Sequence, residues 1–280
     1  MVSVSLQPLS HERHELKKSQ AGILTVLIAC RPEELDETPS SDNLTLIAHT
    51  ITAICKLCIS HDGHLPMSMP PFPSSRSSPF VQICHGIPGL LILLAYARSR
   101  DSIIRTYWEP EWDEAILLGS EKLWEQGLLS KGGGLCHGIA GNAWPLLMLH
   151  NSLKYNNDNT TKGSKASRYI TNSGPQQQQR LTGDQFLSRA LAFLLHARET
   201  PPYKAQNLSS ETQYRIPDNP YSLFEGLAGT VSAWAEACVA IVARLQKMEG
   251  DKSREDDSVE ADEAVRNHLQ NELGFPWLTI

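Results

Sequence analysis

Residues 136–141 read Cys-His-Gly-Ile-Ala-Gly, and similar strings stand at residues 84–89 (Cys-His-Gly-Ile-Pro-Gly) and residues 224–229 (Phe-Glu-Gly-Leu-Ala-Gly). In each string two glycines stand three positions apart, and an apolar segment with helical spacing follows. Glycine permits positive φ and close approach of neighbouring backbone, so a helix can begin directly after a tight turn. We therefore predict that the three strings are equivalent turns of an internal repeat, and that each opens a helix.

Each motif is also preceded by a second amphipathic segment, which predicts pairs of helices. The predicted helices before the motifs span residues 44–59, 112–128 and 185–198, and those after the motifs span residues 90–97, 143–149 and 230–245. The motifs start at residues 84, 136 and 224, whereas a helical pair with its connectors gives a repeat of about 55 residues. Polar residues 155–183 account for most of the excess and predict a disordered insertion. We expect a degraded fourth copy at residues 18–29.

Composition and charge exclude several classes of protein. The formal net charge is −6, which argues against a general nucleic-acid binder, because such a protein needs a basic surface. The longest apolar runs, such as residues 89–97, are far shorter than the roughly 20 residues that span a bilayer, so we expect no transmembrane segment. The first 30 residues lack the order of features in a signal peptide. We expect a cytoplasmic protein with reduced cysteines, and peripheral attachment at the plasma membrane stays open.

Cys84, Cys136 and His137 are the candidate metal ligands. Each lies at the start of a repeat motif, so equivalent positions in neighbouring repeats should converge on one inner face. Two thiolates and one imidazole suit zinc, and three protein ligands leave a fourth coordination position open, as in catalytic zinc sites. The alternative is a pair of buried structural cysteines with satisfied histidines.

Two other patterns are weaker candidates for chemistry. Cys55 and Cys58 form a Cys-x-x-Cys pair, but they lie within an apolar helical pattern with no second ligand pair nearby, so we interpret them as core or helix-surface cysteines. Glu225 stands where the other motifs have histidine, and we favour a structural carboxylate there. A hydrolase or cyclase acting through carboxylates would need a pair of acidic residues on the motifs, and only Glu225 fits.

The strings at residues 83–89, 133–142 and 218–229 resemble the lanthionine synthetase C-like family, and the resemblance runs from about residue 44 to residue 280 apart from the insertions. In that family the fold is an α,α-toroid of seven helical hairpins around a central zinc ion. The resemblance implies an all-α chain with one partial toroid domain over residues 1–280, built from about three to four hairpins. An acidic loop is expected near residues 249–263.

The resemblance also implies a function. Bacterial members cyclise dehydrated peptides into lanthionines, and eukaryotic relatives bind glutathione and are thought to add it to dehydroamino-acid residues. By similarity, Cys84, Cys136 and His137 hold the zinc, and Lys131 and Arg215 hold the carboxylates of glutathione. His85 takes the place of a residue proposed to assist proton transfer, or it is a partner that orients the site. The expected partners are glutathione or a thiol-bearing peptide, and a dehydrated peptide or protein.

The chain departs from the family pattern in two respects. Family members are longer, and about half of the toroid is missing at the amino-terminal side. The His-Gly pair that family enzymes carry in a further repeat is absent near Lys18, and His11 and His14 do not match its spacing. These departures keep a second reading open, in which the chain is a catalytically inactive scaffold that binds zinc, glutathione or a protein partner.

Overall fold

Helices make up nearly all of the regular structure that the computed structural model describes. The described residues are 20–35, 42–66, 80–129, 131–154, 182–200 and 219–250. The helices are α1 (Gln20–Ala29), α2 (Pro32–Leu35), α3 (Asn43–Ser60), α4 (Ile87–Arg98), α5 (Asp101–Thr106), α6 (Pro110–Gln126), α7 (Ile139–Lys154), α9 (Gly183–Ala197) and α10 (Leu227–Gly250). Within these ranges the strands are β1 (Val81–Gln82) and β2 (His85–Gly86), an antiparallel hairpin with the pairs Val81–Gly86 and Gln82–His85. The all-α prediction is therefore confirmed.

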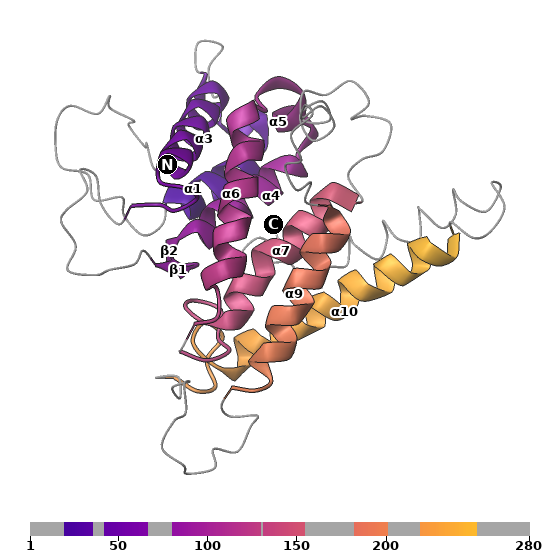
Figure 1. Ribbon diagram of the computed structural model, residues 1–280. Coiled ribbons are helices and arrows are strands. Elements are labelled where there is room, and N and C mark those ends of the chain that lie inside the picture. The colour runs from indigo at the N-terminus through magenta and orange to yellow at the C-terminus, as the bar shows by residue number, and fades with distance from the viewer. Residues whose placement is uncertain are drawn as a thin grey trace, which may run out of the picture.

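The helices form two rows that alternate along the chain (Figure 1). The helices that follow a motif pack against one another in order, α4 against α7 and α7 against α10, and α1 packs against α4 at the beginning of this row. The helices that precede a motif form the second row: α3 packs on α6, α6 on α4, and α9 on both α7 and α10. In the described residues, helices that precede a motif thus alternate with helices that follow one, as the sequence predicts, and the neighbours along the chain that pack on each other are α4 with α6, α7 with α9, and α9 with α10.

Helices α4 and α9 bury different shares of their surface, and the sequence of each helix reflects this difference. Helix α4 lies among α1, α6 and α7, and Leu90, Leu91, Leu93 and Leu94 are fully buried, so this helix is apolar on all sides. Helix α9 instead buries one stripe with the spacing of a single helical face, formed by Phe186, Ala190, Phe193 and Ala197. Helix α4 is therefore surrounded by other helices, whereas α9 turns one face to the core.

Close backbone packing explains the paired glycines of the motifs. A Cβ atom on Gly141 would overlap the carbonyl oxygen of Leu135, and one on Gly229 would overlap the carbonyl oxygen of Leu223, which occupies the same place in its motif. The first glycine of the pair is equally restricted, because Gly86 has φ +119° and a Cβ there would meet the carbonyl oxygen of Phe80. Each motif turn is thus folded tightly onto its own preceding segment, and the following helix begins from it.

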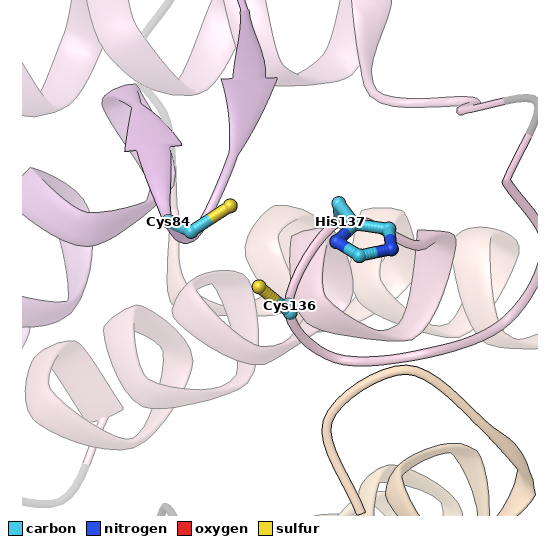
Figure 2. Close-up of side chains that lie close together, drawn as sticks. All are labelled: Cys84, Cys136 and His137. Carbon is cyan, nitrogen blue, oxygen red and sulfur yellow. The ribbon is translucent and has the colours of Figure 1, made fainter. Parts of the chain in front are cut away.

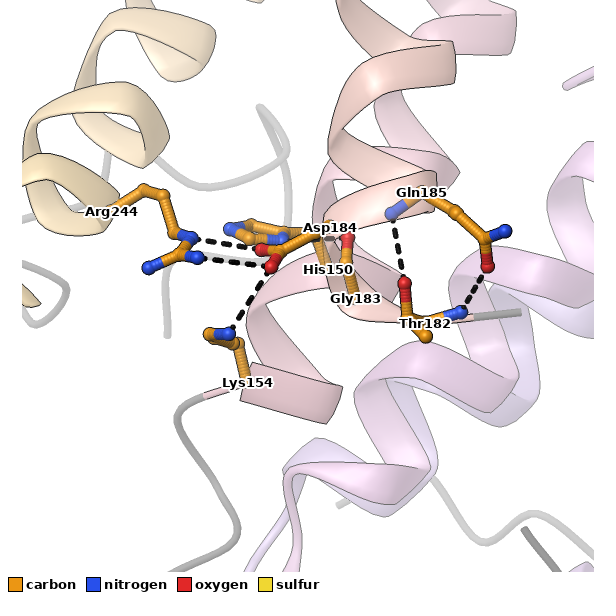
Figure 3. A network of polar contacts seen from close by, with 7 residues as sticks. All are labelled: His150, Lys154, Thr182, Gly183, Asp184, Gln185 and Arg244. Atoms are coloured by element: carbon orange, nitrogen blue, oxygen red, sulfur yellow. Dashed lines mark hydrogen bonds and ion pairs between the residues drawn. The ribbon is translucent and has the colours of Figure 1, made fainter. Parts of the chain in front are cut away.

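A polar network joins α7, α9 and α10 (Figure 3). Asp184, in the first turn of α9, accepts hydrogen bonds from Nε and Nη2 of Arg244 in α10 at 2.8 and 3.0 Å, and Nζ of Lys154 in α7 lies 3.3 Å away. Beside it, Nδ1 of His150 in α7 lies 2.8 Å from the carbonyl oxygen of Gly183. The network fixes the start of α9 against both α7 and α10, although α9 follows the predicted insertion.

Two boundaries differ from the sequence prediction. Thr182 caps α9, since its side chain accepts from the N–H of Gln185 and the side chain of Gln185 accepts from the N–H of Thr182, so Gly183 belongs to a helix and not to the insertion. Helix α10 continues to Gly250, so Glu249 is helical rather than part of an acidic loop. The remainder of the predicted insertion and loop, residues 155–181 and 251–263, lies outside the described residues.

Two helices qualify the expectation that the chain has no membrane-spanning segment. Residues Asn43–Ser60 of α3 and Leu227–Glu249 of α10 are long and apolar enough to cross a bilayer by length and composition alone. Both helices also bury side chains against the core, such as Ile51 and Cys55 of α3 and Ala233 and Ala237 of α10. Core helices of soluble proteins pass the same test of length and composition, so the test does not distinguish a core helix from a membrane-spanning one.

The packing of the motif turns predicts a large difference between two Gly→Ala substitutions. Gly141→Ala should lower the free energy of unfolding by about 2 kcal/mol or more, because the new methyl group overlaps backbone that cannot move aside. Gly22→Ala in α1 is the matched control: no atom lies within 4 Å of the added Cβ, so the variant should gain up to about 1 kcal/mol from helix propensity. Urea unfolding followed by circular dichroism measures both, and equal effects would contradict the close approach.

Candidate metal centre

Backbone hydrogen bonds connect the first residues of the three motifs. The N–H of Cys84 donates to the carbonyl oxygen of Cys136 at 3.4 Å, and the N–H of Cys136 donates to the carbonyl oxygen of Phe224 at 2.7 Å. Equivalent residues of successive repeats are thus neighbours, although 52 and 88 positions separate them in the chain. The first positions of the motifs therefore lie side by side, as the repeat predicts.

The structure brings Cys84, Cys136 and His137 together (Figure 2). Cys84 lies in the turn between β1 and β2, and the other two residues lie in the turn before α7. Their sulfur and imidazole nitrogen atoms all lie within 4.8 Å of one another, and each side chain is partly buried. Among the described residues, these three side chains form the one group of at least three His, Cys, Asp or Glu residues whose ligand atoms lie close enough together to share a metal ion.

The donor set fits a zinc ion. Zn–S bonds of about 2.3 Å and Zn–N bonds of about 2.0 Å in a tetrahedral site place ligand atoms about 3.5 to 4 Å apart. The three side chains are therefore already close to that spacing. Three soft or borderline ligands leave a fourth position for a water molecule or a substrate.

The protonation of the two thiols depends on their contact. The hydrogen bond with Cys84 raises the pKa of the Cys136 thiol well above its usual value, burial raises it further, and His137 partly opposes both effects. Two adjacent sulfur atoms cannot both carry a negative charge without a compensating cation, so they retain a proton between them. A divalent cation bound at this position would displace that proton.

The other predicted site residues are placed as follows. His85 lies in β2 directly after Cys84, is partly buried, and its ring centroid is 5.6 Å from that of Phe80. Lys131 is exposed in the segment between α6 and α7, five residues before Cys136. Arg215 lies outside the described residues.

Cys55 and Cys58 have the surroundings of core residues. Both side chains are fully buried in α3. Burial raises the pKa of the Cys58 thiol to about 12 and also raises that of Cys55, so neither is a ready thiolate. These surroundings favour the interpretation that the Cys-x-x-Cys pair is structural.

Glu225 makes local hydrogen bonds within its own turn. Its N–H donates to Oγ of Ser222 at 3.1 Å, and Nδ2 of Asn219 donates to its Oε2 atom. The carboxylate therefore contributes to the shape of the third motif turn, which favours the structural role over an acid–base one.

Sequence reasoning missed two buried polar residues next to the motif turns. Asn142 and Thr230 each stand six residues after the first residue of their motif, in the mostly apolar first turn of the helix that follows. The signal was present in the sequence, because a polar residue recurs at one offset in two repeats, but its hydrogen-bond partners lie on distant segments.

Comparison with known proteins identifies the family. The family model described as lanthionine synthetase C-like protein matches residues 20–190. The chain belongs to this family. The match includes α1, which lies before the start expected from the motifs, and it ends within α9, so the third motif lies beyond it. The described helices are accordingly a part of the α,α-toroid of lanthionine synthetase C-like proteins.

Two curated relatives each match somewhat more than half of this lanthionine synthetase C-like chain. A Danio rerio protein named glutathione S-transferase LANCL1 is 31% identical over 169 residues, which are 57% of this chain and 31% of the relative. The Arabidopsis thaliana LanC-like protein GCL1 is 30% identical over 167 residues, 58% of this chain and 29% of the relative. The match therefore spans less than a third of the length of each relative.

The thiol pair predicts a metal affinity that rises with pH. Since the pKa of Cys136 is raised, binding of a divalent ion such as zinc must release a thiol proton, and each released proton strengthens apparent binding about tenfold per pH unit below the thiol pKa. Competition with a chromophoric chelator between about pH 6 and pH 8, corrected for protonation of the chelator, measures the slope. An affinity independent of pH would indicate ligands other than these thiols.

Proposed function

We propose that this chain activates a thiol at zinc and adds it to a dehydroamino-acid residue. The thiol would be glutathione or a peptide cysteine, and the electrophile would be dehydroalanine or dehydrobutyrine in a peptide or protein. The observation that carries the proposal is the convergence of Cys84, Cys136 and His137, with their ligand atoms within 4.8 Å of one another.

The proposed ligands suit a thiol substrate. When bound, zinc would supply a Lewis acid that keeps the substrate thiol deprotonated at neutral pH. The thiolates of Cys84 and Cys136 balance the charge of the ion, so an incoming sulfur remains electron-rich and nucleophilic. His137 completes the protein ligand set and leaves the fourth position to the substrate.

The addition requires one new bond and one proton transfer. The substrate sulfur, having released its proton, forms a bond to the β-carbon, and the electron pair of the carbon–carbon double bond moves to the α-carbon. The α-carbon then takes up a proton. His85 is the proposed donor, because it directly follows Cys84 and histidine is a common general acid in enzymes.

Lys131 is the proposed contact for a substrate carboxylate. It is exposed on the segment that leads into Cys136, so its ammonium group is available to a ligand at the metal centre. An ammonium–carboxylate pair would orient glutathione, which carries two carboxylates. Arg215 is proposed for the second one. The name of the Danio rerio relative supports glutathione as the thiol.

A non-catalytic role is the second candidate. A His-Gly pair that family enzymes carry is absent near Lys18. A scaffold of this kind would bind zinc, glutathione or a protein partner without forming a carbon–sulfur bond. A cytoplasmic location is proposed for either role.

The metal site predicts a specific loss of zinc. The purified chain should contain close to one equivalent of zinc, and Cys136→Ala should lose most of it, because one of three protein ligands is removed. Cys238→Ala is the matched control: Cys238 is an exposed cysteine on α10, outside the cluster, and its loss should leave the zinc content unchanged. Elemental analysis measures all three proteins, and equal zinc in all of them would remove the proposed site.

The reaction predicts a thioether product and a role for Lys131. Incubation with glutathione and a dehydrobutyrine peptide should give the adduct, detected by mass spectrometry, and Cys136→Ala should give none. Lys131→Gln should raise KM for glutathione about fivefold or more with little change in kcat, because a ground-state ion pair is removed. Lys56→Gln, which removes an exposed lysine paired with Glu111 between α3 and α6, is the control and should leave KM unchanged. A zinc-loaded chain that forms no adduct would favour the scaffold role.

A further inference from the structure

Asn142 makes two buried hydrogen bonds that connect three segments of the chain. Its side chain is fully buried in the first turn of α7, and Nδ2 donates to the carbonyl oxygen of Val81 at 3.0 Å and to that of Gly127 at 2.8 Å. Both partners are acceptors only, so the nitrogen of the amide must face them. The amide therefore uses both of its N–H donors on main-chain carbonyl groups from β1 and from the end of α6.

Each of these segments leads to a proposed metal ligand. Val81 is three residues before Cys84 in the β1–β2 hairpin, and Gly127 begins the segment that runs to Cys136. Asn142 itself lies in α7, which starts at Ile139, two residues after His137. The side chain of Asn142 thus connects the segment that leads to Cys84 with the segment that leads to Cys136.

The close packing around Gly127 also involves the amide of Asn142. A Cβ atom on Gly127 would lie 3.3 Å from Nδ2 of Asn142 and closer still to Phe193 and to the carbonyl oxygen of Leu123. Glycine at this position lets the end of α6 approach the amide. The contact therefore depends both on the amide of Asn142 and on the absence of a side chain at residue 127.

The next repeat contains an equivalent junction. Thr230 also stands six residues after the first residue of its motif, is buried, and its Oγ1 donates to the carbonyl oxygen of Gly133 at 2.8 Å. Gly133 is three residues before Cys136, just as Val81 is three residues before Cys84. Each cysteine-bearing turn is therefore held at the same point by a polar side chain from the following repeat.

Burying an amide side chain at this position is energetically unfavourable, which indicates that Asn142 has a specific role. In the first repeat the equivalent residue is Leu90, which is fully buried, so an apolar side chain suits the helix. Within the described residues, Oδ1 of Asn142 is buried and has no hydrogen-bond partner. Burying an unpaired polar atom is unfavourable, so the two donated hydrogen bonds must compensate for it.

We propose that Asn142 is a positioning residue that sets the separation of the Cys84 and Cys136 sulfur atoms by fixing Val81 and Gly127 to the first turn of α7. The inference rests on the proposed function for its purpose, since a fixed spacing matters for a shared zinc ion. The spacing itself is a property of the metal-free chain and is measured without metal.

The test uses two substitutions and one control. Asn142→Leu places the residue of the first repeat in the second and removes both donors, and Asn142→Thr keeps one donor, as in the third repeat. Thr52→Val is the control, because it removes the partly buried hydrogen bond from Nε1 of Trp112 at 2.8 Å between α6 and α3, away from the motif turns. Circular dichroism and Tm establish that each variant is folded and how much stability it has lost.

The spacing of the thiols is read in the metal-free, full-length chain. A short bifunctional thiol reagent such as dibromobimane joins Cys84 to Cys136 only when both sulfur atoms are close, and peptide mapping identifies the product. We expect the rate of this crosslink to fall at least about fivefold in Asn142→Leu, to recover partly in Asn142→Thr, and to stay unchanged in Thr52→Val at a comparable loss of Tm.

Zinc affinity supplies the second readout. Residues that orient metal ligands typically change affinity about tenfold to a hundredfold, and we expect a loss of that size in Asn142→Leu but not in Thr52→Val. Unchanged crosslinking in a folded Asn142→Leu, or an equal loss in Thr52→Val, would overturn the inference. If Asn142→Leu does not fold, the comparison of Asn142→Thr with Thr52→Val decides by the same criteria. Crosslinking that depends on Asn142 in a chain that binds no zinc would refute the proposed function and leave the positioning role intact.

Discussion

The main-chain hydrogen bonds between neighbouring motif turns are the constraint on which the rest of the structure depends. The first residue of one motif donates to the first residue of the next, from Cys84 to Cys136 and from Cys136 to Phe224. Because these bonds join backbone atoms, they hold whatever side chains the three positions carry. Two of the positions carry cysteine, so the same bonds that order the repeats also place two sulfur atoms beside each other.

Tight packing lets these turns come so close. The glycines of each motif leave no room for a Cβ, since carbonyl oxygens of the same turn occupy the space next to Gly141 and Gly229. Behind the turns, α4 is buried on all sides and α9 packs an apolar stripe against the core, so the turns rest on closely packed helices. Buried polar side chains then tie one repeat to the next, as Asn142 and Thr230 do. The chemical site is thus a consequence of how the repeats stack.

Much of the site could be predicted from the sequence because the repeat relates distant positions. Cys84, Cys136 and His137 were candidates only because equivalent positions of stacked repeats must lie close together, and their ligand atoms do. Asn142 could not be assigned a role in this way, since its partners Val81 and Gly127 are carbonyl groups, and every residue carries one. A role for Lys131 in binding a carboxylate stays a prediction.

The sequence by itself determined the helical class, the order of the helices that flank the motifs and the equivalence of the three motifs, because hydrophobic spacing and paired glycines are local properties of the chain. It also supplied the strings that mark the family. Only the tertiary structure decided which carbonyl groups meet which side chains, that α9 begins at Gly183, and that the sulfur atoms share a hydrogen bond. These features depend on contacts between segments tens of residues apart, whose geometry is fixed only when the helices pack together.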